Sequence, residues 1–431
     1  MPITAGFFVP HPPLIIPAVG MGKERGINAT VDSYNKIAAQ IKKLSPETIV
    51  FITPHSVMYS DYIHISPGAR ATGSFARFGA PQASYETVYD TEFIDDLVKI
   101  FNSDNIKAGT DGERDASLDH GTLIPIHFIN EQYTVYKSVR ISISGLSFAE
   151  HFKTGEAIRK ASGEKNIVII ASGDLSHKLT DDGPYGYVKE GPEFDSKIVE
   201  IVKSGDLKKT LELSASFTEK AAECGLRSLI MMAGALGCSY TSELLSYEGP
   251  FGVGYLTAAF CPVDPYVRLA RNTLEGLVKT KKIPLSPIDL PDEMTTNRAG
   301  VFVSIKKFGE LRGCIGTIAP TQKNIAEEII ANAVSSGTKD PRFHPVAEDD
   351  LPDLDYSVDV LAPPEPISSF NELDVKKYGV IVTNGYRRGL LLPNLDGVDT
   401  VAEQVDIALR KAGINPREKY QMERFEVTRH K

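Results

Sequence analysis

Short apolar runs alternate with amphipathic segments up to about residue 265 of the chain. The apolar runs have the length of buried strands, and the amphipathic segments repeat their apolar residues at intervals of three and four, as surface helices do. This alternation predicts an α/β fold in which helices cover a sheet. The predicted strands span residues 3–9, 48–53, 136–144 and 166–171. The predicted helices span residues 31–44, 92–103, 148–162, 193–204 and 225–236.

The pattern changes close to residue 263. An amphipathic run over 266–279 is followed by a proline-interrupted stretch over 280–293 that has no apolar periodicity. Because 431 residues are too many for one typical core, we predict two domains, 1–262 and 263–431. The second should be a smaller α+β domain. Its predicted elements are strands at 301–305 and 354–360, helices at 322–336 and 399–412, and a hairpin over 379–393 that turns at Asn384-Gly385.

Composition and charge narrow the function classes. The apolar and charged fractions, 42% and 24%, are ordinary for a soluble globular protein. A net charge of -9 argues against a broad nucleic-acid surface, so we expect no nucleic-acid partner. No segment has the length and apolarity of a membrane span, and the N-terminus lacks a basic signal region, so we expect a cytoplasmic protein. The four cysteines show no C-x-x-C spacing, which indicates neither a zinc knuckle nor a disulfide framework.

Histidines follow three of the predicted strands. His11 and His55 each end a Pro-His pair directly after a strand, and His177 lies in the polar turn after a third. Open α/β folds keep their ligand sites at the carboxyl edge of the sheet. A lone histidine is usually structural, but the repeated placement favours a site. We predict that His11, His55 and Glu223 hold Fe(II), because two imidazoles and one carboxylate leave positions open for O₂ chemistry.

Two further histidines have candidate roles. An unliganded His177 could take a proton from a phenol-like hydroxyl and return it later, because an imidazole titrates near neutrality. Asp119-His120 stands at the start of a predicted helix. His120 could therefore hydrogen-bond substrate or oxygen, or the pair could simply be a helix cap formed by Asp119. The residues alone leave these two interpretations equal.

Several of these segments also resemble a known family. The segments are Pro10–Pro13, Thr53–Ser56, Leu118–Thr122 with Pro125, and Ser172–His177. In this order they resemble the class III extradiol ring-cleaving dioxygenases of the LigB type, and equally their Memo-like relatives, over roughly residues 1–262. The resemblance implies an oxidoreductase that binds Fe(II) and acts with O₂ on a catechol-type aromatic substrate. It also implies His11, His55 and a residue of Glu223-Cys224-Gly225 as ligands, His177 as acid/base and His120 near the substrate.

The third ligand is where the chain departs from the ring-cleaving pattern. Catalytic members of that family use a glutamate, whereas Memo-like members place a cysteine before a glycine. Here Glu223 and Cys224 are adjacent. We expect Glu223 to be the ligand and keep Cys224 as the alternative. A thiolate would favour a softer metal and a non-oxygenase function.

The C-terminal half has one conspicuous segment, Leu311–Thr317. Its two glycines around Cys314 indicate either a tight turn that could present a thiol or bind an anion, or a β-bulge with a buried cysteine, and on these residues alone we favour the bulge. This segment, together with Asn297–Val303, Asp340–Phe343 and Asp355–Val358, resembles the AMMECR family over about residues 266–431. The resemblance implies no reaction. Arg312 and Cys314 are therefore candidate residues without an assigned chemistry.

The combination of the two halves resembles the AmmeMemoRadiSam system protein A family. That resemblance implies a radical-SAM partner on a separate polypeptide, because this chain lacks a C-x₃-C-x₂-C motif for the cluster. Two functional classes therefore stay open. The N-terminal half is either an Fe(II)-dependent extradiol dioxygenase, which we favour, or a metal-binding redox or scaffold module of a modification pathway.

Overall fold

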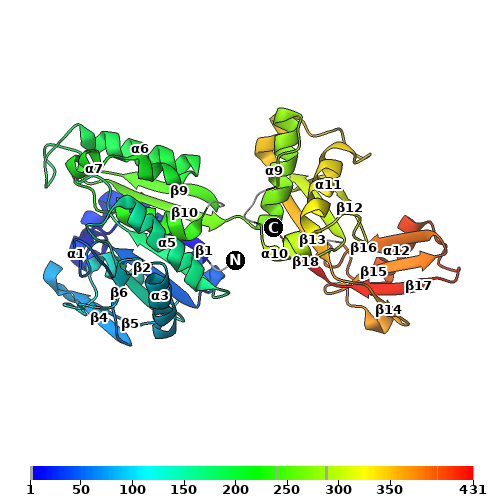
Figure 1. The fold of residues 1–431 in the computed structure, drawn as a ribbon, viewed down its shortest axis with the longest axis horizontal. Helices are drawn as coiled ribbons and strands as arrows, with labels where there is room; N and C mark the ends of the chain where they lie inside the picture. The colour runs from blue at the N-terminus through cyan, green and yellow to red at the C-terminus, as the bar shows by residue number, and fades with distance from the viewer. Residues whose placement is uncertain (1–2, 238–239, 287–289, 396, 431) are drawn as a thin grey trace. The chain divides into compact units, whose positions relative to one another are not determined.

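The chain divides into two compact units, Met1–Pro262 and Val263–Lys431, each with its own hydrophobic core (Figure 1). The computed structural model describes residues 3–237, 240–286, 290–395 and 397–430. The predicted fold class, a helix-covered α/β sheet followed by a smaller α+β domain, is confirmed.

A six-stranded mixed sheet forms the centre of the N-terminal unit, with strand order β7-β2-β8-β1-β10-β9. The first four strands are parallel, whereas β10 pairs antiparallel with both β1 and β9. The residues of strands β1, β2 and β8 are almost all buried, which explains the continuous apolar runs in their sequences. The strands are β1 (Ile3–Val9), β2 (Thr48–Thr53), β7 (Lys137–Ser142), β8 (Ile167–Ser172), β9 (Tyr240–Glu248) and β10 (Tyr255–Pro262).

Helices cover this sheet in two groups. Helix α2 packs with α4 and contacts β9 and β10, while α5 packs with α8, which contacts β8 and β1. Side chains cap several of these helices, as Ser147 and Glu150 do in a reciprocal capping box on α5. The helices are α1 (Pro17–Gly20), α2 (Asn28–Leu44), α3 (Thr91–Ser103), α4 (His120–Asn130), α5 (Phe148–Ser162), α6 (Glu190–Ser204), α7 (Ala215–Ala221) and α8 (Leu226–Leu236).

Two small sheets complete the N-terminal unit. One is an antiparallel hairpin of β4 (Arg70–Phe75) and β5 (Ala80–Val88), and the other pairs β3 (Ile63–His64) with β6 (Ala108–Gly109) in parallel. Neither was predicted, and neither were β9 and β10. The buried stretch of β10 is Tyr255–Phe260, and its middle residues Thr257, Ala258 and Ala259 interrupt the run of large apolar side chains that marks a buried strand in the sequence.

The C-terminal unit contains two four-stranded antiparallel sheets, ordered β12-β11-β13-β18 and β14-β17-β15-β16. Helices α9 and α11 pack together, with α11 on β11 and β12, and α12 packs on β15 and β16. The strands are β11 (Val301–Lys307), β12 (Glu310–Gly316), β13 (Leu354–Leu361), β14 (Glu365–Ile367), β15 (Gly379–Asn384), β16 (Arg387–Leu391), β17 (Gln421–Phe425) and β18 (Val427–His430). The helices are α9 (Pro265–Thr280), α10 (Asp292–Thr296), α11 (Ile325–Thr338) and α12 (Val401–Ala412).

Of the two structures considered for the segment around Cys314, the favoured β-bulge is the one present. The segment is strand β12, and a tight turn precedes it at Phe308 and Gly309, both with positive φ. A register shift at Arg312 forms the bulge, and Cys314 itself is half-buried. Gly313 serves close packing, because a Cβ there would lie 2.2 Å from the carbonyl oxygen of Ser336 on α11.

Candidate metal centre

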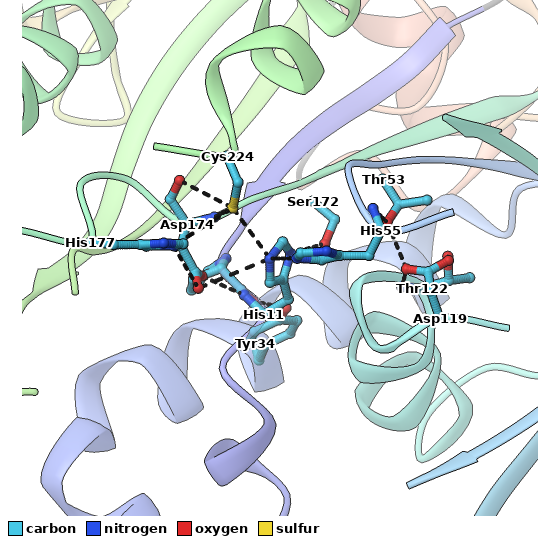
Figure 2. Close-up of polar contacts among 11 residues, drawn as sticks. His11, Tyr34, Thr53, His55, Asp119, Thr122, Ser172, Asp174, His177 and Cys224 are labelled. Carbon is cyan, nitrogen blue, oxygen red and sulfur yellow. Dashed lines mark hydrogen bonds and ion pairs between the residues drawn. The ribbon is translucent and has the colours of Figure 1, made fainter. Parts of the chain in front are cut away.

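Three parallel strands deliver side chains to one edge of the N-terminal sheet (Figure 2). His11 follows β1 by two residues, His55 follows β2 by two, and Asp174 follows β8 by two. Because parallel neighbours end at the same edge, side chains from distant parts of the sequence meet there. The backbone N–H of His11 donates to Asp174 Oδ1 at 2.8 Å, which joins the first and third of these strand ends.

The imidazoles of His11 and His55 bring their Nε2 atoms to 3.0 Å. Two nitrogens that bind one ion at right angles, each about 2.1 Å from it, would lie about 3 Å apart, so the pair fits a shared cation. His11 Nδ1 is hydrogen-bonded to Ser172 Oγ at 2.9 Å, which leaves His11 Nε2 free to face the site. Burial lowers the pKa of His11 to about 3, which keeps the imidazole in the neutral, metal-binding form.

The sulfur of Cys224 also approaches His11. Its Sγ lies 3.4 Å from His11 Nε2 and accepts a hydrogen bond from the Asp174 backbone N–H at 3.2 Å. Burial raises the pKa of the thiol, so binding a cation there as thiolate would release a proton. The segment that carries Cys224 lies directly before α8 and is held by hydrogen bonds to the Asp174 carbonyl.

Glu223, the expected third ligand, is engaged elsewhere. Its Oε2 accepts a hydrogen bond from the Leu226 backbone N–H at 2.7 Å, at the start of α8. Burial raises the pKa of this carboxyl to about 7. Of the two adjacent alternatives, the geometry favours Cys224.

Asp174 belongs to the site although we assigned it no role from the sequence. Its Oδ2 lies 4.0 Å from His11 Nε2 and 3.8 Å from His177 Nε2. The strand-end placement that singled out the histidines applies equally to this residue and could have found it. Among the described residues, two groups have ligand atoms close enough to hold one ion: His11 with His55 and His120, and His11 with Asp174 and Cys224.

His120 begins α4, and both interpretations of its neighbourhood have a basis in the structure. Asp119 caps the helix by accepting from the Thr122 backbone N–H at 3.1 Å. The His120 ring stacks on that of His55, with centroids 4.1 Å apart. Burial, with a further contribution from His55, lowers the pKa of His120 to about 4. His120 is therefore a neutral imidazole within reach of the centre.

His177 flanks the centre from the turn after β8. Its Nε2 lies 3.8 Å from Cys224 Sγ and its ring stacks on that of Tyr185, with centroids 5.2 Å apart. The side chain is half-buried. It lies outside both groups of ligand atoms.

A cavity of about 720 Å³ lies beside His55 and His120. The β4–β5 hairpin contributes one wall, including Phe78, whose ring lies 5.4 Å from that of His120 between centroids. Five residues with hydroxyl groups line the cavity, three of them on the hairpin: Ser56, Thr72, Ser74, Ser84 and Ser117. The volume is sufficient for a small organic molecule.

The two C-terminal candidates both lie on β12. Arg312 donates to the His344 carbonyl at 2.7 Å and to Asp350 at 3.0 Å, so its guanidinium ties the strand to the segment after α11. Cys314 is half-buried, and its Sγ accepts a hydrogen bond from the Ser304 hydroxyl at 3.2 Å. These contacts account for both side chains as structural elements of this unit.

Comparisons with known proteins agree with the two units. Residues 5–258 match the family model of the catalytic LigB subunit of aromatic ring-opening dioxygenase, and residues 267–430 match AMMECR1. Protein CA_C1420 of Clostridium acetobutylicum is 42% identical over 467 aligned positions, which cover 100% of both chains. A Thermotoga maritima protein is 50% identical over 169 residues, 39% of this chain and 97% of its own. The crystal structure of protein PH0010 from Pyrococcus horikoshii is 33% identical and covers 38% of this chain and 88% of its own, with a TM-score of 0.36.

The chain belongs to the LigB family, with an AMMECR1 domain fused to its C-terminal side. The predicted combination of the two families is confirmed. The N-terminal domain carries histidine, aspartate and cysteine side chains that could hold a metal ion. Across the part of the chain that the structure describes, no helix combines the length and apolarity needed to cross a membrane.

Proposed function

We propose that the N-terminal domain is a metal-dependent redox module whose ion is held by His11, which belongs to both groups of ligand atoms, together with His55 from one group and Cys224 from the other. One observation carries the proposal: Cys224 Sγ lies 3.4 Å from His11 Nε2, whereas Glu223 is bonded to the start of α8. A donor set of two imidazoles and a thiolate suits softer ions than Fe(II), such as copper. A bound copper ion would supply one-electron chemistry.

Side chains around the proposed ligands would orient them and contact the bound molecule. Ser172 holds the His11 ring so that Nε2 faces inward. His120 and His55 present their rings to the cavity, where a small ligand would enter. His177, half-buried and beside Cys224, would receive or return a proton as the ligand reacts. The radical-SAM partner predicted from the family resemblance would be a separate protein that supplies or uses the product.

Ring-opening oxygenation remains the second candidate function. The match to the LigB catalytic subunit favours it, as does the placement of His120 and His177 on either side of the ligand atoms. In this case the ion would be Fe(II), and a catechol-type ring would occupy the cavity beside Phe78. Asp174 would then supply the carboxylate donor next to His11.

The ligand assignment is tested by metal analysis of matched variants. The protein is purified without oxygen, loaded separately with Fe(II), Cu(I) or Zn(II), desalted and measured by elemental analysis. Cys224→Ser should lose the ion, and Glu223→Gln, which keeps a carbonyl oxygen for the Leu226 N–H, should retain it. Retention by Cys224→Ser together with loss by Glu223→Gln would reverse the assignment.

A second measurement separates the two functions. Oxygen consumption by the Fe(II)-loaded protein is followed with a panel of catechols, using the His11→Ala, His55→Ala double variant as the inactive control. Turnover that depends on both histidines would establish the dioxygenase. No turnover by protein that retains its full complement of iron would favour the redox module.

A further inference from the structure

A buried guanidinium lies behind the cavity wall. Arg140, in β7, is 1% exposed, and arginine is almost never fully buried unless it is paired. Its Nε donates to Ser66 Oγ at 2.7 Å, and its two terminal nitrogens donate to the carbonyls of Ser117 at 2.5 Å and Asp115 at 3.2 Å. The guanidinium thus binds the backbone of the segment that leads into α4.

The same guanidinium faces the carboxylate that ends this segment. Arg140 Nη1 lies 3.6 Å from Asp119 Oδ2, and the Asp119 side chain is 8% exposed. Opposite charges attract more strongly where water is largely excluded, so this pair favours one position of the Asp119 side chain. Among the described residues, Arg140 is the one arginine or lysine with a side-chain nitrogen within 4.0 Å of the Asp119 carboxylate.

Asp119 in turn connects to two of the site histidines, and Figure 2 shows the connection to His55 through Thr53. Its Oδ1 accepts a hydrogen bond from Thr53 Oγ1 at 2.7 Å, and Thr53 Oγ1 accepts one from the His55 backbone N–H at 3.2 Å. Through its cap on α4, Asp119 also sets the position of His120, the first residue of that helix. A continuous series of polar contacts therefore joins Arg140 to the backbone of His55.

We infer that Arg140 is a positioning residue of the metal centre, acting through Asp119 and Thr53 on His55 and through the α4 cap on His120. The inference rests on the proposed metal site. Arg140 does not contact the ligand atoms. It holds Asp119 in one place, and the fixed carboxylate positions the two imidazoles beside the cavity.

The opposite end of β2 carries a matched control. Thr48, the first residue of that strand, donates to Asp90 Oδ2 at 2.5 Å, and Lys165 donates to the same oxygen at 2.9 Å. Asp90 caps α3 as Asp119 caps α4. Both arrangements join a β2 threonine, a buried capping aspartate and a cation, but only the one with Arg140 leads to the histidines.

The test compares Arg140→Gln with Lys165→Gln in the full chain, using Co(II) alone as the probe. Anaerobic titration gives the affinity, the visible absorption spectrum reports the ligand field, and urea unfolding gives the stability of each variant. We expect both variants to lose stability. Arg140→Gln should also bind Co(II) at least tenfold more weakly, with an altered spectrum, as is usual when a residue that orients a ligand is lost. Lys165→Gln should keep the wild-type affinity and spectrum.

Two further variants cover the case in which Arg140→Gln does not fold. Asp119→Asn removes the charge but keeps an acceptor oxygen for Thr53, and it should weaken Co(II) binding in the same direction. Arg140→Lys keeps the charge and should recover part of the affinity. Wild-type affinity and spectrum in Arg140→Gln, or in Asp119→Asn where Arg140→Gln is unfolded, would overturn the role of Arg140. Failure of the wild-type protein to bind Co(II) would instead overturn the metal site itself.

Discussion

Gly173 and Gly225 approach so closely that a Cβ added to Gly173 would lie 2.1 Å from the Cα of Gly225. Gly173 belongs to the turn after β8, and Gly225 directly precedes α8. At this crossing the Asp174 carbonyl accepts hydrogen bonds from the backbone N–H groups of Cys224 and Gly225, at 3.3 and 3.0 Å. The absence of two side chains therefore allows Cys224 to reach the strand ends.

Gly173→Ala should disturb this crossing. Because the Cβ would meet backbone atoms, which cannot rotate away, we expect the unfolding free energy to fall by about 1–3 kcal/mol, as for other overpacked sites. Co(II) binding should weaken as Cys224 is displaced. Urea unfolding and anaerobic titration measure the two effects. Gly26→Ala, whose Cβ would meet only the tip of the Phe251 ring, is the control and should keep its metal affinity.

Ser172→Ala should affect the metal site without creating a clash. Ser172 Oγ is the partner of His11 Nδ1 at 2.9 Å, and both residues are buried. Loss of this contact frees the ring to change its orientation and tautomer, which typically costs 10- to 100-fold in metal affinity. Competitive titration against a chelator measures the change. An unchanged affinity would mean that packing alone orients His11.

His177→Ala should retain the metal, because His177 Nε2 is 3.8 Å from Cys224 Sγ and belongs to neither group of ligand atoms. Elemental analysis of the variant should give the wild-type stoichiometry. If the protein turns over catechols, the same variant should lose about 10²-fold or more in oxygen consumption, the usual effect of a lost acid/base. Loss of the metal would make His177 a ligand.

Asp350 should make the stability of the C-terminal domain sensitive to acid. Hydrogen bonds from Lys307, the Ala347 backbone and Arg312 lower the pKa of Asp350 to about 2, from an ordinary value of 3.8. The ionised carboxylate thus stabilises the fold above about pH 4, and this contribution is lost as the pH falls towards 2. Urea unfolding between pH 5 and 2.5 should show a smaller acid loss for Asp350→Asn than for the wild type. Equal losses would show that the contribution of Asp350 is negligible.

The parallel part of the N-terminal sheet could be predicted because its strands are buried on both faces. Strands β1, β2 and β8 are therefore mostly apolar in sequence, and the polar residues that follow each strand mark the edge of the sheet where the candidate site lies. The antiparallel pair β9 and β10 has no such signature, since β9 alternates between exposed and half-buried positions and β10 is rich in small residues.

The site could be predicted down to its segments, and the choice between adjacent residues required the structure. Strand-end placement identified His11, His55 and His177, and the same logic extends to Asp174. Glu223 and Cys224 are neighbours in the sequence, so no spacing rule separates them. The orientation of Cys224 depends on the close approach of Gly173 and Gly225, which brings together segments from different parts of the chain. In the C-terminal domain the same limit applies to Gly313, whose role is set by the approach of α11.

The contact between His11 and Cys224 joins residues that are 213 positions apart. During synthesis, a nascent chain displays His11 and His55 long before Cys224 leaves the ribosome, and contacts this distant form late in folding. A chain that ends before Cys224 therefore lacks the sulfur donor of the proposed set and has only nitrogen and oxygen donors for an ion. With Cys224 as the proposed ligand, selection of a softer metal would wait until nearly the whole first domain had been made and folded.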